Sequence, residues 1–183
     1  MNFQDYFKGK KVTVMGLGLL GRGVGDAAYI AAAGAEEVIV TDLKTELELI
    51  ESVEKLREYS NIKFVLGEHR LEDFTNRDLI IVAPSVPLDS QYVAHGVATG
   101  GRKVQTAALF AELTKIPIIG VTGTRGKSTT SAMIHHVLQY ATGEEVIYGG
   151  TVRGVSNLQL LHKVTADSLA VFELDSWQLQ GFG

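Results

Sequence analysis

The chain has 183 residues, no cysteine and a formal net charge of −4. The lack of cysteine excludes a disulfide framework and a thiolate zinc site, and the acidic balance without a long basic run argues against a nucleic-acid partner. No apolar run is long enough to span a membrane and residues 1–7 lack signal-peptide character, so we expect a cytoplasmic protein with no membrane partner.

The first third of the chain alternates apolar runs with a helical pattern, which favours an α/β domain with a parallel sheet. Residues 12–15 predict a strand, and residues 38–40 predict the next one. Between them we expect a helix that ends near Gly34. This helix turns small apolar residues inward: Val24, Ala27, Ala28, Ala31 and Ala32.

A glycine-rich turn, Gly16-Leu-Gly-Leu-Leu-Gly21, joins the first strand to this helix, and Asp42 follows 21 positions after its last glycine. This pattern is typical of a turn that places the diphosphate of a dinucleotide at a helix N-terminus, with the acidic residue near the ribose. The alternative interpretation is a close-packed turn that binds nothing.

The alternation continues beyond Asp42. We expect a helix over 47–56, strands over 62–66 and 79–82, and a helix over 91–97 that ends at Gly100-Gly101. Ala83-Pro-Ser-Val-Pro87 follows the last of these strands, at the sheet edge where open α/β sheets bind ligands. His69, in the turn after residues 62–66, is a further candidate for that edge.

A second glycine loop, Gly120-Val-Thr-Gly-Thr-Arg-Gly-Lys-Ser-Thr-Thr130, lies between the apolar run 116–119 and a helical pattern. Gly123 and Gly126 allow backbone amides to converge on a phosphate, Lys127 supplies a charge for the β- and γ-phosphates, and the Ser128 hydroxyl can ligate Mg²⁺. The spacing departs from GxxxxGK[ST], because Val121 stands where the first glycine is expected.

Around this loop, Thr106 predicts the N-cap of a helix over 107–113, and strands over 146–148 and 169–172 follow the loop's own helix, the last one ending at Glu173. Five apolar residues recur at helical spacing behind the loop: Ala132, Met133, Ile134, Val137 and Leu138. We interpret His135 and His136 as surface or packing residues and Trp177 as a core residue.

The loop Thr122-Gly-Thr-Arg-Gly-Lys-Ser-Thr-Thr130 resembles the ATP loop of the Mur ligase family, the ATP-dependent amide ligases of peptidoglycan precursor synthesis; folylpolyglutamate and cyanophycin synthetases carry related loops. A Rossmann-like turn ahead of such a loop is most similar to the D-glutamate-adding members. Phe172-Glu-Leu-Asp-Ser-Trp-Gln-Leu179 is also similar to a family motif, Glu-x-Ser-Ser-Phe-Gln-Leu. The resemblance implies a ligase that uses ATP and Mg²⁺ to add D-glutamate to UDP-N-acetylmuramoyl-L-alanine through an acyl phosphate.

The resemblance also implies site residues. Lys127 and Glu173 would be catalytic, and Ser128 and Glu173 would hold Mg²⁺. ATP would contact the second loop at Gly123, Thr124, Arg125, Gly126, Lys127, Ser128 and Thr129. The UDP part of the sugar nucleotide would contact Gly16, Leu17, Gly18, Leu19, Leu20, Gly21, Asp42, Lys44, Gly67, Thr151 and Asp175.

Several positions depart from the family's pattern. Thr151 stands for an Asn, Asp175 for a Ser, and Ala83-Pro-Ser-Val for a Ser-Pro-Gly-Val loop. A carboxylate at 175 would repel an anionic substrate unless Arg153, itself a departure, or Mg²⁺ offsets it. Arg125 replaces a residue that is usually Asn.

The expected fold class is α/β: a Rossmann-like UDP-binding domain over 1–103, then the first part of a P-loop ATP-binding α/β domain over 104–183. The chain ends before the family's metal-binding histidine, its carbamylated lysine and its third domain, so we expect a truncated, monomeric fragment that is inactive alone. One alternative is a non-catalytic nucleotide-binding module or degenerate paralogue. A less favoured one is an NAD-dependent oxidoreductase, which leaves the second loop unexplained.

Overall fold

Five parallel strands form the first sheet of the computed structural model, which describes residues 2–19, 21–87 and 89–182. The strands are β1 (Lys11–Met15), β2 (Glu37–Asp42), β3 (Ile62–Leu66), β4 (Leu79–Val82) and β5 (Arg102–Val104), in the order β3-β2-β1-β4-β5. From β1 the chain adds β2 and β3 on one side, and it then crosses to the other side of β1 to add β4 and β5. The carboxyl ends of β1 and β4 therefore open the crevice at which such sheets bind ligands.

The second sheet has three parallel strands, β6 (Ile118–Val121), β7 (Ile147–Gly150) and β8 (Ala170–Glu173), in the order β6-β8-β7. The register pairs Glu173, the last residue of the central strand, with Val121 on one side and Gly150 on the other. The end of β8 therefore lies beside the start of the second glycine loop.

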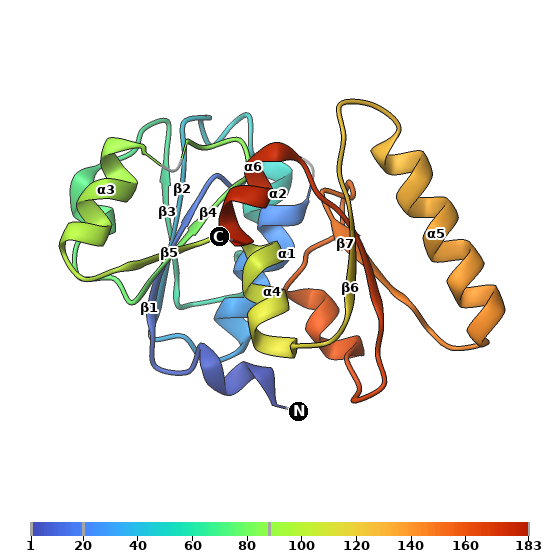
Figure 1. The fold of residues 1–183 in the computed structure, drawn as a ribbon. Helices are drawn as coiled ribbons and strands as arrows, with labels where there is room; N and C mark the ends of the chain where they lie inside the picture. Colours follow the sequence, from blue (N-terminus) through green and yellow to red (C-terminus); the bar gives the residue numbers. More distant parts are fainter. Residues whose placement is uncertain (1, 20, 88, 183) are drawn as a thin grey trace.

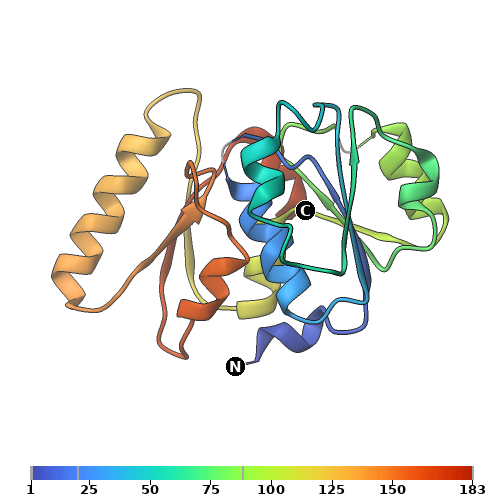
Figure 2. The ribbon, with the colours of Figure 1, turned by 180° about the vertical axis from the view of Figure 1, so that it is seen from behind.

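Helices lie between and outside the two sheets. In Figures 1 and 2, α1 (Arg22–Ala32), α4 (Thr106–Thr114) and the 3₁₀ helix η3 (Gln159–Lys163) lie between them. The long α5 (Lys127–Thr142) covers the outer side of the second sheet, and α3 (Gln91–Ala98) lies outside the first with η2 (Leu71–Phe74). The remaining short helices are η1 (Phe3–Tyr6), α2 (Ile50–Glu54), α6 (Ser176–Leu179) and η4 (Gln180–Phe182).

One buried apolar cluster runs through the layer between the sheets. It joins Val12 of β1 and Ile30 of α1 to Phe110 of α4 and Phe172 of β8, and the rings of the two phenylalanines lie 5.0 Å apart. A smaller cluster fills the outer face of the first sheet: Met15, Phe74, Ile80, Val82 and Val93. The two nucleotide-type units therefore share a core.

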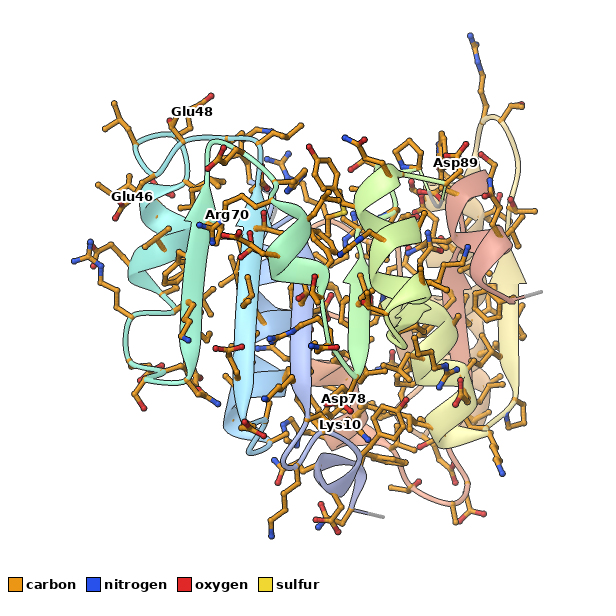
Figure 3. All side chains as sticks on the ribbon, turned by 90° about the vertical axis from the view of Figure 1, so that its left-hand side faces the viewer. Lys10, Glu46, Glu48, Arg70, Asp78 and Asp89 are labelled. Carbon is orange, nitrogen blue, oxygen red and sulfur yellow. The ribbon has the colours of Figure 1, made fainter. Side chains whose placement is uncertain are left out.

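The two ends of the strands in the first sheet carry different residues, as Figure 3 shows. Lys10 and Asp78 lie at the end where the strands begin, and Glu46 and Glu48 lie at the opposite end. Asp78 Oδ2 accepts a hydrogen bond from the backbone amide of Lys11 at 2.7 Å. This bond joins the start of β1 to the residue before β4, at the side of the sheet opposite the first glycine turn.

The structure confirms the α/β fold class and the predicted strands, with boundaries shifted by one or two residues. The strand β5 was missed because it is short, lies at the edge and begins with exposed Arg102 and Lys103. Because β5 pairs with β4, the first sheet continues beyond the Gly100-Gly101 break, as far as Val104.

Several helix predictions were wrong in detail. The helix expected over 47–56 is reduced to five residues, because Thr45 and Glu48 bond each other's side chain and backbone in a turn just before it. Ala32 is exposed at the end of α1. Thr106 is the first helical residue of α4, and Gln105 holds the N-cap position without a side-chain cap.

The apolar face expected behind the second loop is largely exposed. Met133 and Val137 of α5 have exposed fractions of 63% and 61%. Ser131 is the only fully buried residue among the described residues of this helix. Across the described part of the chain, no helix combines the length and apolar character needed to cross a membrane.

Candidate nucleotide-binding sites

The first glycine turn leaves β1 and enters α1 at the crevice between β1 and β4. Gly16 has a φ of 93°, and a Cβ at this position would come within 2.8 Å of the Ala83 Cβ, so the turn packs against the loop after β4 only as glycine. Gly21, with a φ of 81°, is the N-cap of α1. Leu20, which was assigned to the same turn, lies outside the described residues.

The start of α1 offers backbone donors to a ligand. Its first intrahelical bond runs from the Gly25 amide to the Gly21 carbonyl at 3.0 Å. The amides of Arg22, Gly23 and Val24 precede this bond and have no partner within the helix. A helix N-terminus of this kind favours a phosphate or other anion.

Asp42 holds the turn in place. Its Oδ2 accepts a hydrogen bond from the Gly18 amide at 3.0 Å, and its Oδ1 accepts one from the Lys44 amide at 2.9 Å. The Gly67 amide donates to the carbonyls of Asp42 and Lys44 at 3.0 and 2.9 Å. The structure thus brings Asp42, Lys44 and Gly67 together beside the turn, and it gives Asp42 a structural role that the sequence did not reveal.

A cleft of about 380 Å³ opens at this crevice. Its lining includes residues 16–19 of the glycine turn and residues 83–85 of the loop after β4. Charged and aromatic residues from elsewhere also line it: Arg22, Asp26, Asp175 and Trp177. Asp42, Lys44, Gly67 and Thr151 are not among the lining residues. The cleft therefore brings Asp175, which was expected at the UDP site, together with the glycine turn and with Trp177.

Asp175 lines the cleft and also caps a helix, whereas Trp177 differs from its expected role. Asp175 is the N-cap of α6, and its Oδ1 accepts a hydrogen bond from the Gln178 amide at 2.8 Å. No ion pair joins it to Arg153 within the described ranges, so the compensating pair suggested by the sequence does not form there. Trp177 is 41% exposed and faces the cleft instead of filling the core.

The second glycine loop follows β6 and has the backbone shape of a phosphate cradle. Gly123 and Gly126 have φ values of 150° and 78°, and Gly126 is the N-cap of α5. The first bond of α5 runs from the Thr130 amide to the Gly126 carbonyl at 2.9 Å, which leaves the amides of Lys127, Ser128 and Thr129 directed out of the helix start.

The polar side chains of this loop are accessible. Thr124, Arg125, Ser128 and Thr129 are exposed. Lys127 folds back over the loop, and its Nζ donates a hydrogen bond to the Gly123 carbonyl at 2.9 Å. A phosphate in the cradle would meet the ammonium group at this position, where it spans the loop.

Glu173 supplies a carboxylate next to the loop. It is buried at the end of β8, and no hydrogen bond or ion pair to its carboxylate occurs among the described residues. Thr151 lies on its other side, where its amide and hydroxyl both donate to the Glu173 carbonyl at 2.8 and 3.1 Å. Thr151 thus belongs to the edge of the second sheet.

The oxygen donors beside the second glycine loop fit Mg²⁺ bound together with ATP. Mg²⁺ prefers hard oxygen ligands and is commonly held by one or two carboxylates together with substrate phosphates. Ser128 and Glu173 provide a hydroxyl and a carboxylate of this kind. The part of the chain that the structure describes contains no group of three or more acidic, histidine or cysteine side chains that could hold a metal ion without a phosphate.

The histidines have packing roles. The Nε2 of His135 donates to the Val146 carbonyl at 2.8 Å, and its ring stacks on Tyr148 at 4.9 Å. His69 contacts the Thr41 hydroxyl at 2.7 Å and packs against Tyr92; burial lowers the pKa of its imidazole. His69 is not among the residues that line the cleft.

Sequence reasoning missed Asp26, which lies on the buried face of α1. Its Oδ1 accepts hydrogen bonds from the Ser156 hydroxyl at 2.6 Å and from the Leu158 amide at 3.2 Å. Burial raises the pKa of Asp26 to about 6, although these two hydrogen bonds and the charge of Arg22 lower it. The one available signal was an aspartate on an otherwise apolar helix face.

Comparisons with known proteins agree with this arrangement. The family model described as Mur ligase MurD-like, N-terminal domain, matches residues 10–105. UDP-N-acetylmuramoylalanine–D-glutamate ligases from Roseiflexus sp. (strain RS-1) and Treponema pallidum (strain Nichols) are each 39% identical, over 96% and 94% of this chain. The chain spans 37% and 32% of those relatives' lengths.

Among solved structures, the UDP-N-acetylmuramate:L-alanyl-gamma-D-glutamyl-meso-diaminopimelate ligase from Neisseria meningitides is similar, with a TM-score of 0.51 and 21% identity. The match covers 91% of this chain and 52% of that one. At this identity the likeness concerns the fold, and it agrees with the two α/β units described above.

Proposed function

This chain belongs to the Mur ligase family, with a MurD-like N-terminal domain, and from this premise we propose that it carries the UDP-sugar and ATP sites of a ligase that adds D-glutamate to UDP-N-acetylmuramoyl-L-alanine. The observation that carries the proposal is the presence of two glycine-capped helix N-termini in one chain, each following a strand of its own sheet. One phosphate site would suffice for a simple nucleotide-binding module. A ligase that activates a nucleotide-linked carboxylate needs two.

In the proposed arrangement the first unit, residues 1–103 extended through the end of β5, binds the sugar nucleotide. The diphosphate lies at the N-terminus of α1 and the uridine lies toward Asp42. The cleft between the Gly16 turn and Trp177 leads from this unit toward the second one. The acceptor carboxylate of the substrate can thus approach the second glycine loop.

In the second unit, residues 104–183, the chain's own groups position the phosphates. The amides at the start of α5 orient the β- and γ-phosphates, and Lys127 neutralises charge that develops on the transferring group. Ser128 and Glu173 hold Mg²⁺. ATP supplies the phosphoryl group that activates the substrate carboxylate for attack by the amine of D-glutamate. Because ATP and nucleotide sugars are cytoplasmic metabolites, the proposal places the reaction in the cytoplasm.

UDP binding is the direct test of the first unit. We expect calorimetric titration of the chain with UDP to give saturable binding and titration with NADH to give none. The reason is that the second glycine loop fits an ATP-dependent ligase, whereas an NAD-dependent oxidoreductase leaves this loop unexplained. NADH binding at about micromolar affinity (roughly −8 kcal/mol) without a UDP response would support the oxidoreductase alternative and end the proposal.

Lys127→Ala tests the second unit. The substitution removes the ammonium group that spans the loop, and we expect Mg·ATP binding to weaken by about 1.5–3 kcal/mol, the range for a hydrogen bond to a charged group. Lys163→Ala is the matched control, because this exposed lysine pairs with Glu145 elsewhere in the same unit. Unchanged ATP affinity in Lys127→Ala would rule out the phosphate-loop interpretation.

Glu173→Gln should act differently from Lys127→Ala. The amide keeps the shape of the side chain but is a poorer ligand for a hard cation, so the effect should be a higher Mg²⁺ concentration for half-maximal ATP binding. ATP titrations at several Mg²⁺ concentrations measure this requirement. The same Mg²⁺ dependence in parent and variant would remove Glu173 from the metal site.

A further inference from the structure

Arg22 is a charged residue of the first cleft for which the structure shows no partner. It is the first residue of α1 and lines the cleft. Its Nη1 is buried and has no hydrogen-bond partner within the described residues, and no carboxylate of those residues lies within ion-pair distance of it. A buried guanidinium donor without a partner is costly, because its solvation is lost without replacement.

The neighbouring carboxylate does not supply the missing partner. Asp26 lies one helical turn beyond Arg22, close enough for the two charges to interact. However, Oδ1 of Asp26 is already bonded to the Ser156 hydroxyl and the Leu158 amide. The guanidinium is thus kept beside Asp26 without being paired to it, at the wall of the cleft.

The start of α1 also favours an anion. The unpaired amides of Arg22, Gly23 and Val24 mark the positive end of an 11-residue helix. Arg22 is the one cation among the described residues that line the cleft. Of the two carboxylates in the lining, Asp26 is held by Ser156 and Leu158, and Asp175 caps α6.

We propose that Arg22 binds the diphosphate of the sugar nucleotide directly and makes the cleft select a nucleoside diphosphate over the nucleoside. Arginine suits this role, because its planar fork donates two parallel hydrogen bonds to phosphate oxygens. The inference rests on the proposed function, in that it takes the first cleft as the sugar-nucleotide site. It adds a side chain to a site that would otherwise depend on backbone amides alone.

The test compares UDP with uridine on the parent chain and on Arg22→Gln. We expect Arg22→Gln to weaken UDP binding by about ten- to a hundredfold, as the loss of a charged hydrogen bond implies. Uridine, measured by its competition against UDP, should bind both proteins equally. Lys11→Gln is the charge-matched control, because Lys11 begins β1 at the opposite edge of the sheet; its UDP affinity should equal that of the parent.

The outcomes separate the inference from the proposed function. A parent chain that does not bind UDP overturns both. A parent that binds UDP, with Arg22→Gln binding it equally well, overturns only the role of Arg22, as does an equal loss of UDP and uridine binding. Arg22→Lys keeps the charge and loses the fork, so it should show a smaller loss of UDP affinity; it carries the test if circular dichroism shows that Arg22→Gln is unfolded.

Discussion

Phe172→Ala is expected to lower the free energy of unfolding by about 3–5 kcal/mol, the usual cost of removing a buried phenylalanine ring. The side chain is fully buried in the central strand of the second sheet and packs against Phe110 of α4. Since this contact belongs to the cluster that continues into the first sheet, the loss should affect the stability of the whole chain.

Urea denaturation measures this effect with two signals. Far-UV circular dichroism reports both units, and the fluorescence of Trp177, the single tryptophan, reports the end of the second. Both signals should show one transition at the same lowered urea concentration. The control is Phe182→Ala, a ring that is 42% exposed, with an expected change within about 0.5 kcal/mol. Separate transitions for the two signals would contradict the shared core.

Asp26→Asn is expected to change how stability depends on pH. The folded pKa of about 6 lies above the ordinary value of 3.8 because burial disfavours the charged carboxylate. The folded state therefore holds the proton more tightly, and this contribution is complete below pH 3.8 and is lost as the pH rises through 6. At 1.36 kcal/mol per pKa unit, the loss amounts to about 3 kcal/mol.

The amide in Asp26→Asn can still accept hydrogen bonds from Ser156 and Leu158 but does not ionise. The free energy of unfolding of the parent should thus fall between pH 4 and pH 7 relative to that of the variant. Comparing the two proteins cancels groups that both share, such as His69, whose lowered pKa acts in the opposite direction. Parallel pH profiles for the two proteins would show that Asp26 does not carry this penalty.

The strands and the two glycine loops could be predicted from the sequence because their signals are local. A run such as Leu79–Val82 is apolar throughout, as a strand buried on both faces must be. The glycines at 16, 21, 123 and 126 mark positive backbone angles at the start of helices α1 and α5. The two glycine patterns therefore located both of these helix starts.

Part of the wall of the first cleft could not be predicted, because it depends on contacts between distant segments. Asp26 and Ser156 are 130 positions apart, and Trp177 reaches the glycine turn from the far end of the chain. Periodicity in one helix cannot show which inward position meets a polar partner. The same limit applies to Thr106. The sequence predicts it as a helix N-cap, but its hydroxyl accepts a hydrogen bond from the Asn157 side chain instead.

If one chain holds two separate nucleotide sites, UDP and ATP bind to it at the same time, and a paired titration measures this. UDP is titrated into the chain alone and into the chain saturated with Mg²⁺ and a non-hydrolysable ATP analogue. We expect one UDP bound per chain in both cases, with the analogue still in place. Displacement of one ligand by the other would show a single shared site and rule out two separate ones.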